Sequence, residues 1–243
     1  MLPPRKRLAA AVLAAAACAL APVAAWAGVV VSASGPSAAS FPVGKSIGDS
    51  ERIVLRAGDT LTVLDGNGTR VLRGAGTYSL DQQAGPSKRS SFAALTQRRA
   101  ASQVRTGAIR GEGAEAHSPN LWYVDVGQPG TVCVVGTDRV RLWRAATEGD
   151  ATYALRAGAG GASHSITFAD GATLAPWDTS VFPIADGASF ALSGPDGAGG
   201  GTLTFAVLDV VAEEPEALAQ QLIEKGCANQ LELLSTATMI EEG

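Results

Sequence analysis

Short runs of alternating apolar and polar residues predict β-strands in the N-terminal part of the chain. The runs cover residues 28–31, 52–55, 60–64 and 69–72. They are rich in valine, leucine and threonine, residues that favour a pleated, half-buried backbone. The tetrapeptide Asp-Gly-Asn-Gly at 65–68 separates two of the runs and supplies residues that adopt positive φ, as a hairpin requires. Residues 28–81 are therefore predicted to form a small β sheet or barrel.

A second and longer series of strand-like runs follows, separated by turns that contain glycine, aspartate and proline. The runs cover residues 121–126, 131–135, 140–144, 152–156, 164–169, 181–184, 189–192 and 202–211. Many short strands at regular spacing are typical of two sheets packed face to face. We predict a β-sandwich or jelly-roll-like domain over residues 120–211.

Two segments show a helical period instead. Residues 82–119 contain a predicted helix at 91–104, with Phe92 and Leu95 on its apolar face and Ser90 or Ser91 as its cap. Residues 212–243 contain a predicted helix that ends at Gly226, and residues 230–239 can form a second short helix. The chain is thus predicted to be mainly β, with a helical linker between two β regions and a short C-terminal helical segment.

The first 27 residues have the three parts of a secretory signal. Arg5, Lys6 and Arg7 precede an uncharged, alanine-rich run, and Ala-Trp-Ala at 25–27 precedes Gly28. Small residues at these positions suit signal peptidase, so cleavage is predicted between Ala27 and Gly28. An uncleaved membrane anchor and a lipid anchor on Cys18 are the alternatives. Export to the periplasm or the medium, without stable membrane insertion after cleavage, is the prediction.

The net charge of the chain limits the classes of partner that it is expected to bind. The chain has 19 Lys and Arg against 23 Asp and Glu, and removal of the signal takes away three basic residues and leaves a net charge of −7. A net acidic protein is not a general binder of nucleic acid or of anionic membranes. The excess of arginine over lysine and the alanine-rich signal are typical of a bacterial protein encoded by a GC-rich genome.

The mature chain has two cysteines, Cys133 and Cys227. In a compartment that oxidises thiols, one disulfide is the only intramolecular pairing open to them. Such a bond would join the C-terminal helical segment to a strand far back in the sequence. The alternative is a pair of buried free thiols.

Residues 52–69 read Arg-Ile-Val-Leu-Arg-Ala-Gly-Asp-Thr-Leu-Thr-Val-Leu-Asp-Gly-Asn-Gly-Thr. This stretch, with its continuation to about residue 80, resembles the short β repeats of periplasmic FecR-like domains. In those repeats a Gly-Asp step precedes a strand, an Asp-Gly turn and a returning strand. The resemblance implies a β-rich envelope module for interaction or signalling, without catalytic residues.

The sequence predicts no catalytic, metal or cofactor site. It has two histidines, His117 and His164, and lacks the CxxC, HExxH and GxSxG spacings. Trp122, Trp143 and Trp177 lie in the second β region, where exposed rings could stack on sugars, but core positions are the favoured interpretation.

The linker at 82–119 carries the most unusual local charge, with six basic residues before its first acid at Glu112. A solvated connector explains this charge, but Lys88, Arg89, Arg98 and Arg99 could also bind an acidic envelope protein or an anionic envelope polymer. We expect a non-catalytic interaction or structural module of the bacterial envelope. The alternative is a carbohydrate-binding module or hydrolase that uses residues 120–211.

Overall fold

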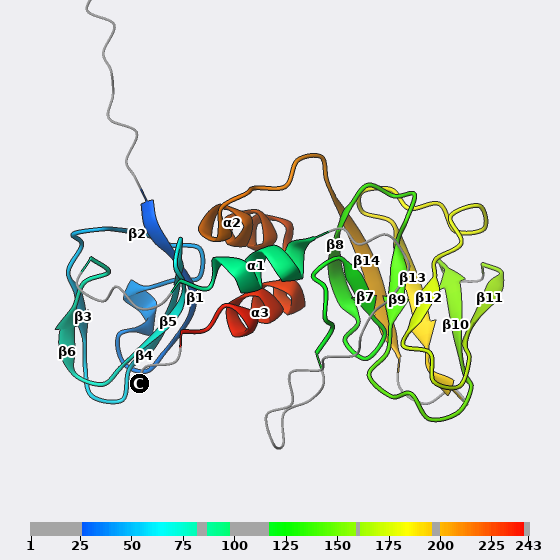
Figure 1. Ribbon diagram of the computed structural model, residues 1–243, viewed down its shortest axis with the longest axis horizontal. Coiled ribbons are helices and arrows are strands. Elements are labelled where there is room, and N and C mark those ends of the chain that lie inside the picture. The colour runs from blue at the N-terminus through cyan, green and yellow to red at the C-terminus, as the bar shows by residue number, and fades with distance from the viewer. Residues whose placement is uncertain (1–25, 82–86, 98–116, 159–160, 196–199, 241–243) are drawn as a thin grey trace, which may run out of the picture.

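A computed structural model describes residues 26–81, 87–97, 117–158, 161–195 and 200–240 of the chain. This part is mainly β, with 14 strands in four sheets and three α-helices (Figure 1). The helices lie between two β units, one built from the N-terminal residues and one from the second half of the chain. The predicted fold class is confirmed. None of the described helices is long and apolar enough to cross a membrane.

The N-terminal unit is an open sheet of four strands, in the order β2-β1-β4-β5, beside a two-stranded sheet. The strands are β1 (Trp26–Ser34), β2 (Ser46–Gly48), β3 (Ile53–Leu55), β4 (Thr60–Asp65), β5 (Gly68–Arg73) and β6 (Gly76–Tyr78), with a 3-10 turn at Ala38–Ser40. Fully buried Val30, Ile47 and Val63 belong to the core of this unit. Since β2 and β5 are edge strands, the unit is a sheet and not a closed barrel.

The predicted hairpin joins β4 to β5. Asp65 Oδ1 accepts the backbone N–H groups of Asn67 at 2.7 Å and Gly68 at 3.1 Å. Gly68 has a φ of 144°, and a Cβ there would lie 2.5 Å from the carbonyl oxygen of Thr238. Only glycine allows this approach of the C-terminal residues to the turn.

The second unit consists of two sheets around one core. The larger sheet has the order β11-β10-β13-β14-β8 and the smaller β12-β9-β7. The strands are β7 (Tyr123–Asp125), β8 (Gly130–Val135), β9 (Arg141–Trp143), β10 (Ala151–Ala157), β11 (Ser163–Phe168), β12 (Leu174–Pro176), β13 (Ser189–Ser193) and β14 (Gly201–Leu208). Leu142 of the smaller sheet shares a buried cluster with Leu155 and Phe205 of the larger one. The predicted sandwich-like arrangement is confirmed.

One strand prediction in this unit was wrong. Residues 181–184 form turn and loop, because Asp178 O accepts the N–H groups of Val181 and Phe182 and folds the chain back. Phe182 and Ile184 are both buried, which produces an alternating pattern without a strand.

The sequence pattern also gave no prediction for β2 and β6 of the N-terminal unit or for β12 of the second unit, which have three residues each.

The tryptophans predicted to be core residues are buried. Trp122, Trp143 and Trp177 are exposed by 9%, 6% and 5%. The ring of Trp177 packs edge to face against Phe190 and Phe205, with centroids 5.1 and 5.0 Å away, and its Nε1–H donates to Phe182 O. Trp143 and Trp177 therefore offer no stacking surface to an external sugar.

The helical layer consists of α1 (Arg89–Thr96), α2 (Pro215–Lys225) and α3 (Ala228–Ala237). Its apolar residues, such as Leu95, Leu218 and Leu234, share one buried cluster with Val29 of the N-terminal unit and Ala206 of the second unit. The three helices and both β units therefore bury apolar surface in common. The helix predicted at 91–104 begins two residues earlier, at Arg89, and α1 ends at Thr96, while residues 98–104 lie outside the described part of the chain. Neither Ser90 nor Ser91 is its N-cap, and among the described residues no side chain caps it. Gly226 ends α2 with φ 74°, as predicted.

The residues after α3 return to the N-terminal sheet. Thr69 N–H donates to Thr238 O at 2.8 Å, and Ile240 N–H donates to Thr69 O at 2.9 Å. The hydroxyls of Thr69 and Thr238, both 0% exposed, are 2.9 Å apart. This contact attaches the end of the helical layer to the edge strand β5.

Candidate protein-binding groove

A groove of about 510 Å³ lies between α1 and the chain that leads into α2. Phe92, Trp122 and Pro215 are buried and supply apolar lining, whereas Arg89, Glu213 and Glu214 are exposed and supply the charged rim. The walls come from residues far apart in the sequence that meet only at the joint between the β units. We call this feature the joint groove.

The position of Trp122 follows from how α1 ends. The last carbonyls of a helix have no partner within the helix. Here Leu121 N–H donates to Leu95 O at 3.1 Å, Trp122 Nε1–H donates to Thr96 O at 2.8 Å, and Asn120 Nδ2 donates to Gln97 O at 2.8 Å. The segment at 120–122 thus satisfies three consecutive carbonyls and fixes the indole ring in the groove.

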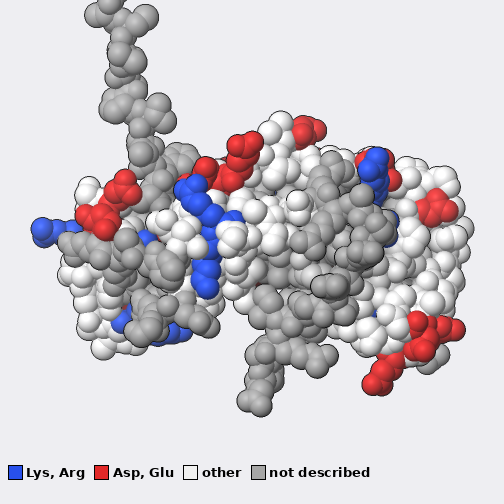
Figure 2. All heavy atoms as spheres, in the orientation of Figure 1, with Lys and Arg blue, Asp and Glu red and all other residues white. Residues whose placement is uncertain are grey.

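The rim of the joint groove carries both signs of charge. Arg89 Nη2 lies 3.7 Å from Glu214 Oε2, and the two side chains are 64% and 54% exposed. An ion pair at this exposure contributes little to stability. Figure 2 shows acidic and basic side chains next to one another near the middle of this face. The charge of Arg89 is therefore partly compensated within the chain.

Three carboxylates, those of Asp65, Glu214 and Glu216, lie close together beneath the rim, at the start of α2. Burial raises the pKa of Glu216, and the carboxylates of Glu214 and Asp65 raise it further, while Arg89 opposes them. Glu216 Oε2 is buried and has no hydrogen-bond partner among the residues that the structure describes. Asp65 is buried as well and lies 3.0 Å from Arg70 Nε. Arg70 and Arg89 each lie beside one of these carboxylates, so both signs of charge are present here as they are on the rim.

The structure places two of the four predicted partner-binding residues. Lys88 and Arg89 lie at the start of α1, where Lys88 N–H donates to Asn67 O at 2.6 Å and Arg89 reaches the rim of the joint groove. Arg98 and Arg99 lie outside the described residues. Binding of an acidic partner by these four residues stays a prediction.

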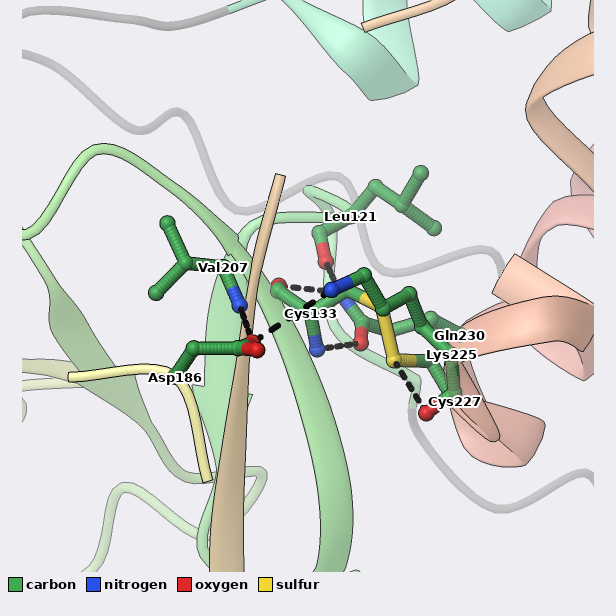
Figure 3. The surroundings of a disulfide bond; sticks show 7 residues. All are labelled: Leu121, Cys133, Asp186, Val207, Lys225, Cys227 and Gln230. Atoms are coloured by element: carbon green, nitrogen blue, oxygen red, sulfur yellow. Dashed lines mark hydrogen bonds and ion pairs between the residues drawn. A yellow bond between two sulfur atoms is a disulfide. The ribbon is translucent and has the colours of Figure 1, made fainter. Parts of the chain in front are cut away.

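The predicted disulfide between Cys133 and Cys227 is present, with a Cα–Cα distance of 5.8 Å, and both residues are 0% exposed (Figure 3). It joins β8 to the turn between α2 and α3. Nearby, Asp186 Oδ1 accepts Val207 N–H at 2.8 Å and lies 3.5 Å from Lys225 Nζ. These two partners hold the pKa of Asp186 below its ordinary value. The disulfide thus fastens the turn that follows α2 to the second β unit, and the exposed Lys225–Asp186 ion pair lies beside it and adds little.

The two histidines lie apart from the joint groove. His164 is half-buried on β11 with its ring centroid 5.8 Å from that of Phe182. His117 lines a separate small cavity of about 30 Å³, the size of one or two water molecules, together with Tyr123 and Gln230. Within the described residues, no three His, Cys, Asp or Glu side chains gather where they could hold a metal ion.

Sequence reasoning missed the joint groove. It favoured a core position for Trp122 over a sugar-stacking one, and it assigned no role to Glu213 or Glu214 beyond the start of a helix. No local signal links these positions to Phe92, because they are brought together by tertiary packing. The basic residues at the start of α1 were the one feature of the groove that the sequence indicated.

Comparisons of the chain with protein-family models, with curated proteins and with solved structures found no match. The resemblance of residues 52–80 to FecR-like domains therefore stays a prediction.

Proposed function

We propose that this chain is an exported, non-catalytic interaction module of the bacterial envelope, and that the joint groove binds a segment of an envelope protein. The groove carries the proposal, because it presents buried aromatic surface at a joint held by a shared core and a disulfide. The signal-like N-terminus and the disulfide support export, since disulfides persist in oxidising compartments.

The lining favours a protein segment over an anionic polymer. An anionic polymer requires a run of cations without internal partners, whereas Arg89 faces Glu214 and lies near the carboxylates of Asp65 and Glu216. Apolar side chains with a mixed polar rim are the usual composition of a protein interface. We expect the bound segment to insert an apolar side chain between Phe92 and Trp122 and to place a basic side chain near Glu213 and Glu214.

The carbohydrate-binding or hydrolase alternative has less support. It needed rings exposed on the second β unit, but Trp143 and Trp177 are interior. The joint groove contains one of the three tryptophans, and its indole N–H is occupied by Thr96 O.

Two neighbouring alanines allow a matched test. Ala93 and Ala94 are both exposed on α1, but only Ala93 lines the joint groove. Each is replaced by the photo-crosslinking residue p-benzoylphenylalanine in the full chain, which is expressed in the native host and irradiated in intact cells. Adducts are then identified by mass spectrometry, including the peptide attached.

We expect Ala93→p-benzoylphenylalanine to give one dominant adduct, with an envelope-protein segment that has an apolar residue and a basic residue close together. Ala94→p-benzoylphenylalanine should give little or none of it. Equal adducts at both positions, no protein adduct, or a polysaccharide adduct at Ala93 would each overturn the proposal.

A further inference from the structure

The predicted signal-cleavage site lies inside the first strand of the N-terminal sheet. β1 spans Trp26–Ser34, and the scissile bond joins Ala27 to Gly28. Trp26 pairs with Gly48 and Gly28 pairs with Ile47, so Ala27 is an extra, bulged residue opposite β2. On the other side of β1, Gly28 pairs with Asp65 of β4. The backbone on the C-terminal side of the bond is therefore flanked by strands on both edges.

The surroundings of Gly28 are also closed to a protease. A Cβ at Gly28 would lie 2.9 Å from both Leu64 O and Val63 Cγ1, so the backbone itself is enclosed. The next three residues, Val29, Val30 and Val31, are 3%, 0% and 9% exposed. A protease must bind the chain around the scissile bond in an extended, unpaired form. Freeing that chain here would expose three buried valines, which makes the local opening costly.

We infer that hydrolysis of the Ala27–Gly28 bond has to occur before β1 is placed between β2 and β4, and that the folded precursor resists signal peptidase. This inference rests on the export proposed above. In the reaction water adds across the peptide bond, the C–N bond breaks, Ala27 gains a carboxylate and Gly28 an ammonium group. The mature sheet keeps every pair between β1 and β4, since those pairs begin at Gly28, and it loses only the pair between Trp26 and Gly48.

The test uses the full-length precursor in detergent micelles with purified signal peptidase. One sample is wild type, refolded and oxidised, with the disulfide verified by mass. A second is Leu61→Asp, which places a charge in the core of the N-terminal unit at a residue 1% exposed and keeps that unit from folding. A third carries a six-residue Gly-Ser spacer between Ala27 and Gly28, which moves the scissile bond out of the strand.

We expect the Leu61→Asp and spacer precursors to be cut after Ala27, and the folded wild type to be cut at least about a hundredfold more slowly, because cleavage then follows the population of the open strand. Equal rates for folded wild type and Leu61→Asp would overturn the inference, as would resistance of the spacer precursor. If the Leu61→Asp precursor is not cut after Ala27, the predicted signal site itself is refuted. Loss of binding at the joint groove is a separate result and would leave the order of cleavage and folding unaffected.

Discussion

The side chain of Gln230 takes the place of a neighbouring strand for Cys133. Its Oε1 accepts the Cys133 N–H at 2.6 Å, and its Nε2 donates to the Cys133 carbonyl at 2.8 Å and to the Leu121 carbonyl at 2.7 Å. β8 is the edge of the five-stranded sheet, so these backbone groups would otherwise be buried without partners. α3 thus covers this edge at the same residue that forms the disulfide.

Replacing Gln230 by alanine should destabilise the protein strongly. The change leaves one buried N–H and two buried carbonyls unpaired, and we expect a loss of about 2 to 4 kcal/mol in the free energy of unfolding. Urea denaturation of the oxidised protein measures it. Asn229→Ala is the control, because Asn229 makes a single bond to Gln128 O, and its loss should stay near 1 kcal/mol. Equal losses for the two variants would contradict the role of Gln230.

The disulfide should make the largest single contribution to stability. It closes a loop across a sequence separation of 94, for which the chain-entropy model gives about 4 to 5 kcal/mol. We expect Cys133→Ala with Cys227→Ala to lower the free energy of unfolding by this order.

Alkylation followed by mass spectrometry checks directly that the disulfide is present. Both cysteines should react only after reduction and unfolding, and labelling of the native, unreduced protein would show that the bond is absent.

Glu216 should contribute more to the stability of the protein in mild acid than at neutral pH. A carboxyl whose pKa is raised in the folded state binds its proton more tightly there than in the unfolded chain. The stabilisation that this tighter proton binding provides is therefore fully present below the pKa of Glu216 in the unfolded chain. It is lost as the pH rises through the raised pKa of Glu216 in the folded protein. Glu216→Gln should raise stability at pH 7 by on the order of 0.5 kcal/mol and flatten this pH dependence.

Thermal unfolding of the Glu216→Gln variant between pH 4 and pH 8 measures this effect. Glu224→Gln, at an exposed carboxylate of the same helix, is the control and should keep the wild-type profile. A Glu216→Gln profile that is parallel to wild type would show that Glu216 does not couple to the fold.

Strands and turns were predictable wherever local chemistry decides them. Alternation identified β4, β5, β8 and β10, and the Asp-Gly-Asn-Gly turn formed because Asp65 accepts the N–H groups of the turn that follows it. Three-residue strands such as β2 are too short to show a period. Residues 181–184 show the opposite failure, since core contacts of Phe182 and Ile184 produced alternation in a loop.

Contacts between distant residues were not predictable from pattern, apart from the disulfide. Cys133 and Cys227 are the two cysteines outside the predicted signal and permit only one pairing, so they could be joined by elimination. In the sequence, Gln230 looks like an ordinary polar residue of a helix. Its hydrogen bonds to Cys133 could not be predicted because they join residues 97 positions apart. The joint groove has the same origin, because Trp122 bonds to Thr96 across 26 positions and tertiary packing brings Pro215 beside both of them.

Trp122→Phe should loosen the end of α1. The phenyl ring keeps most of the packing but removes the donor to Thr96 O, for an expected loss of about 1 to 2 kcal/mol. Hydrogen exchange at Leu121 N–H, which donates to Leu95 O, should become faster. Trp177→Phe removes an equivalent bond to Phe182 O in the other core and should leave Leu121 exchange unchanged. If both variants accelerate hydrogen exchange at Leu121 N–H alike, the destabilisation is global and not local to the groove.

Binding at the joint groove is tested most directly by calorimetric titration of the mature protein with a synthetic peptide that spans the segment cross-linked at Ala93. Wild type is compared with Ala93→Trp, which fills the groove, and with Ala94→Trp, which adds the same ring one position away. We predict that Ala93→Trp binds the peptide with a dissociation constant at least about tenfold larger, equivalent to a loss of 1.4 kcal/mol or more in binding free energy. The dissociation constant of Ala94→Trp should equal that of wild type. Equal affinity in all three proteins would contradict a binding site in the joint groove.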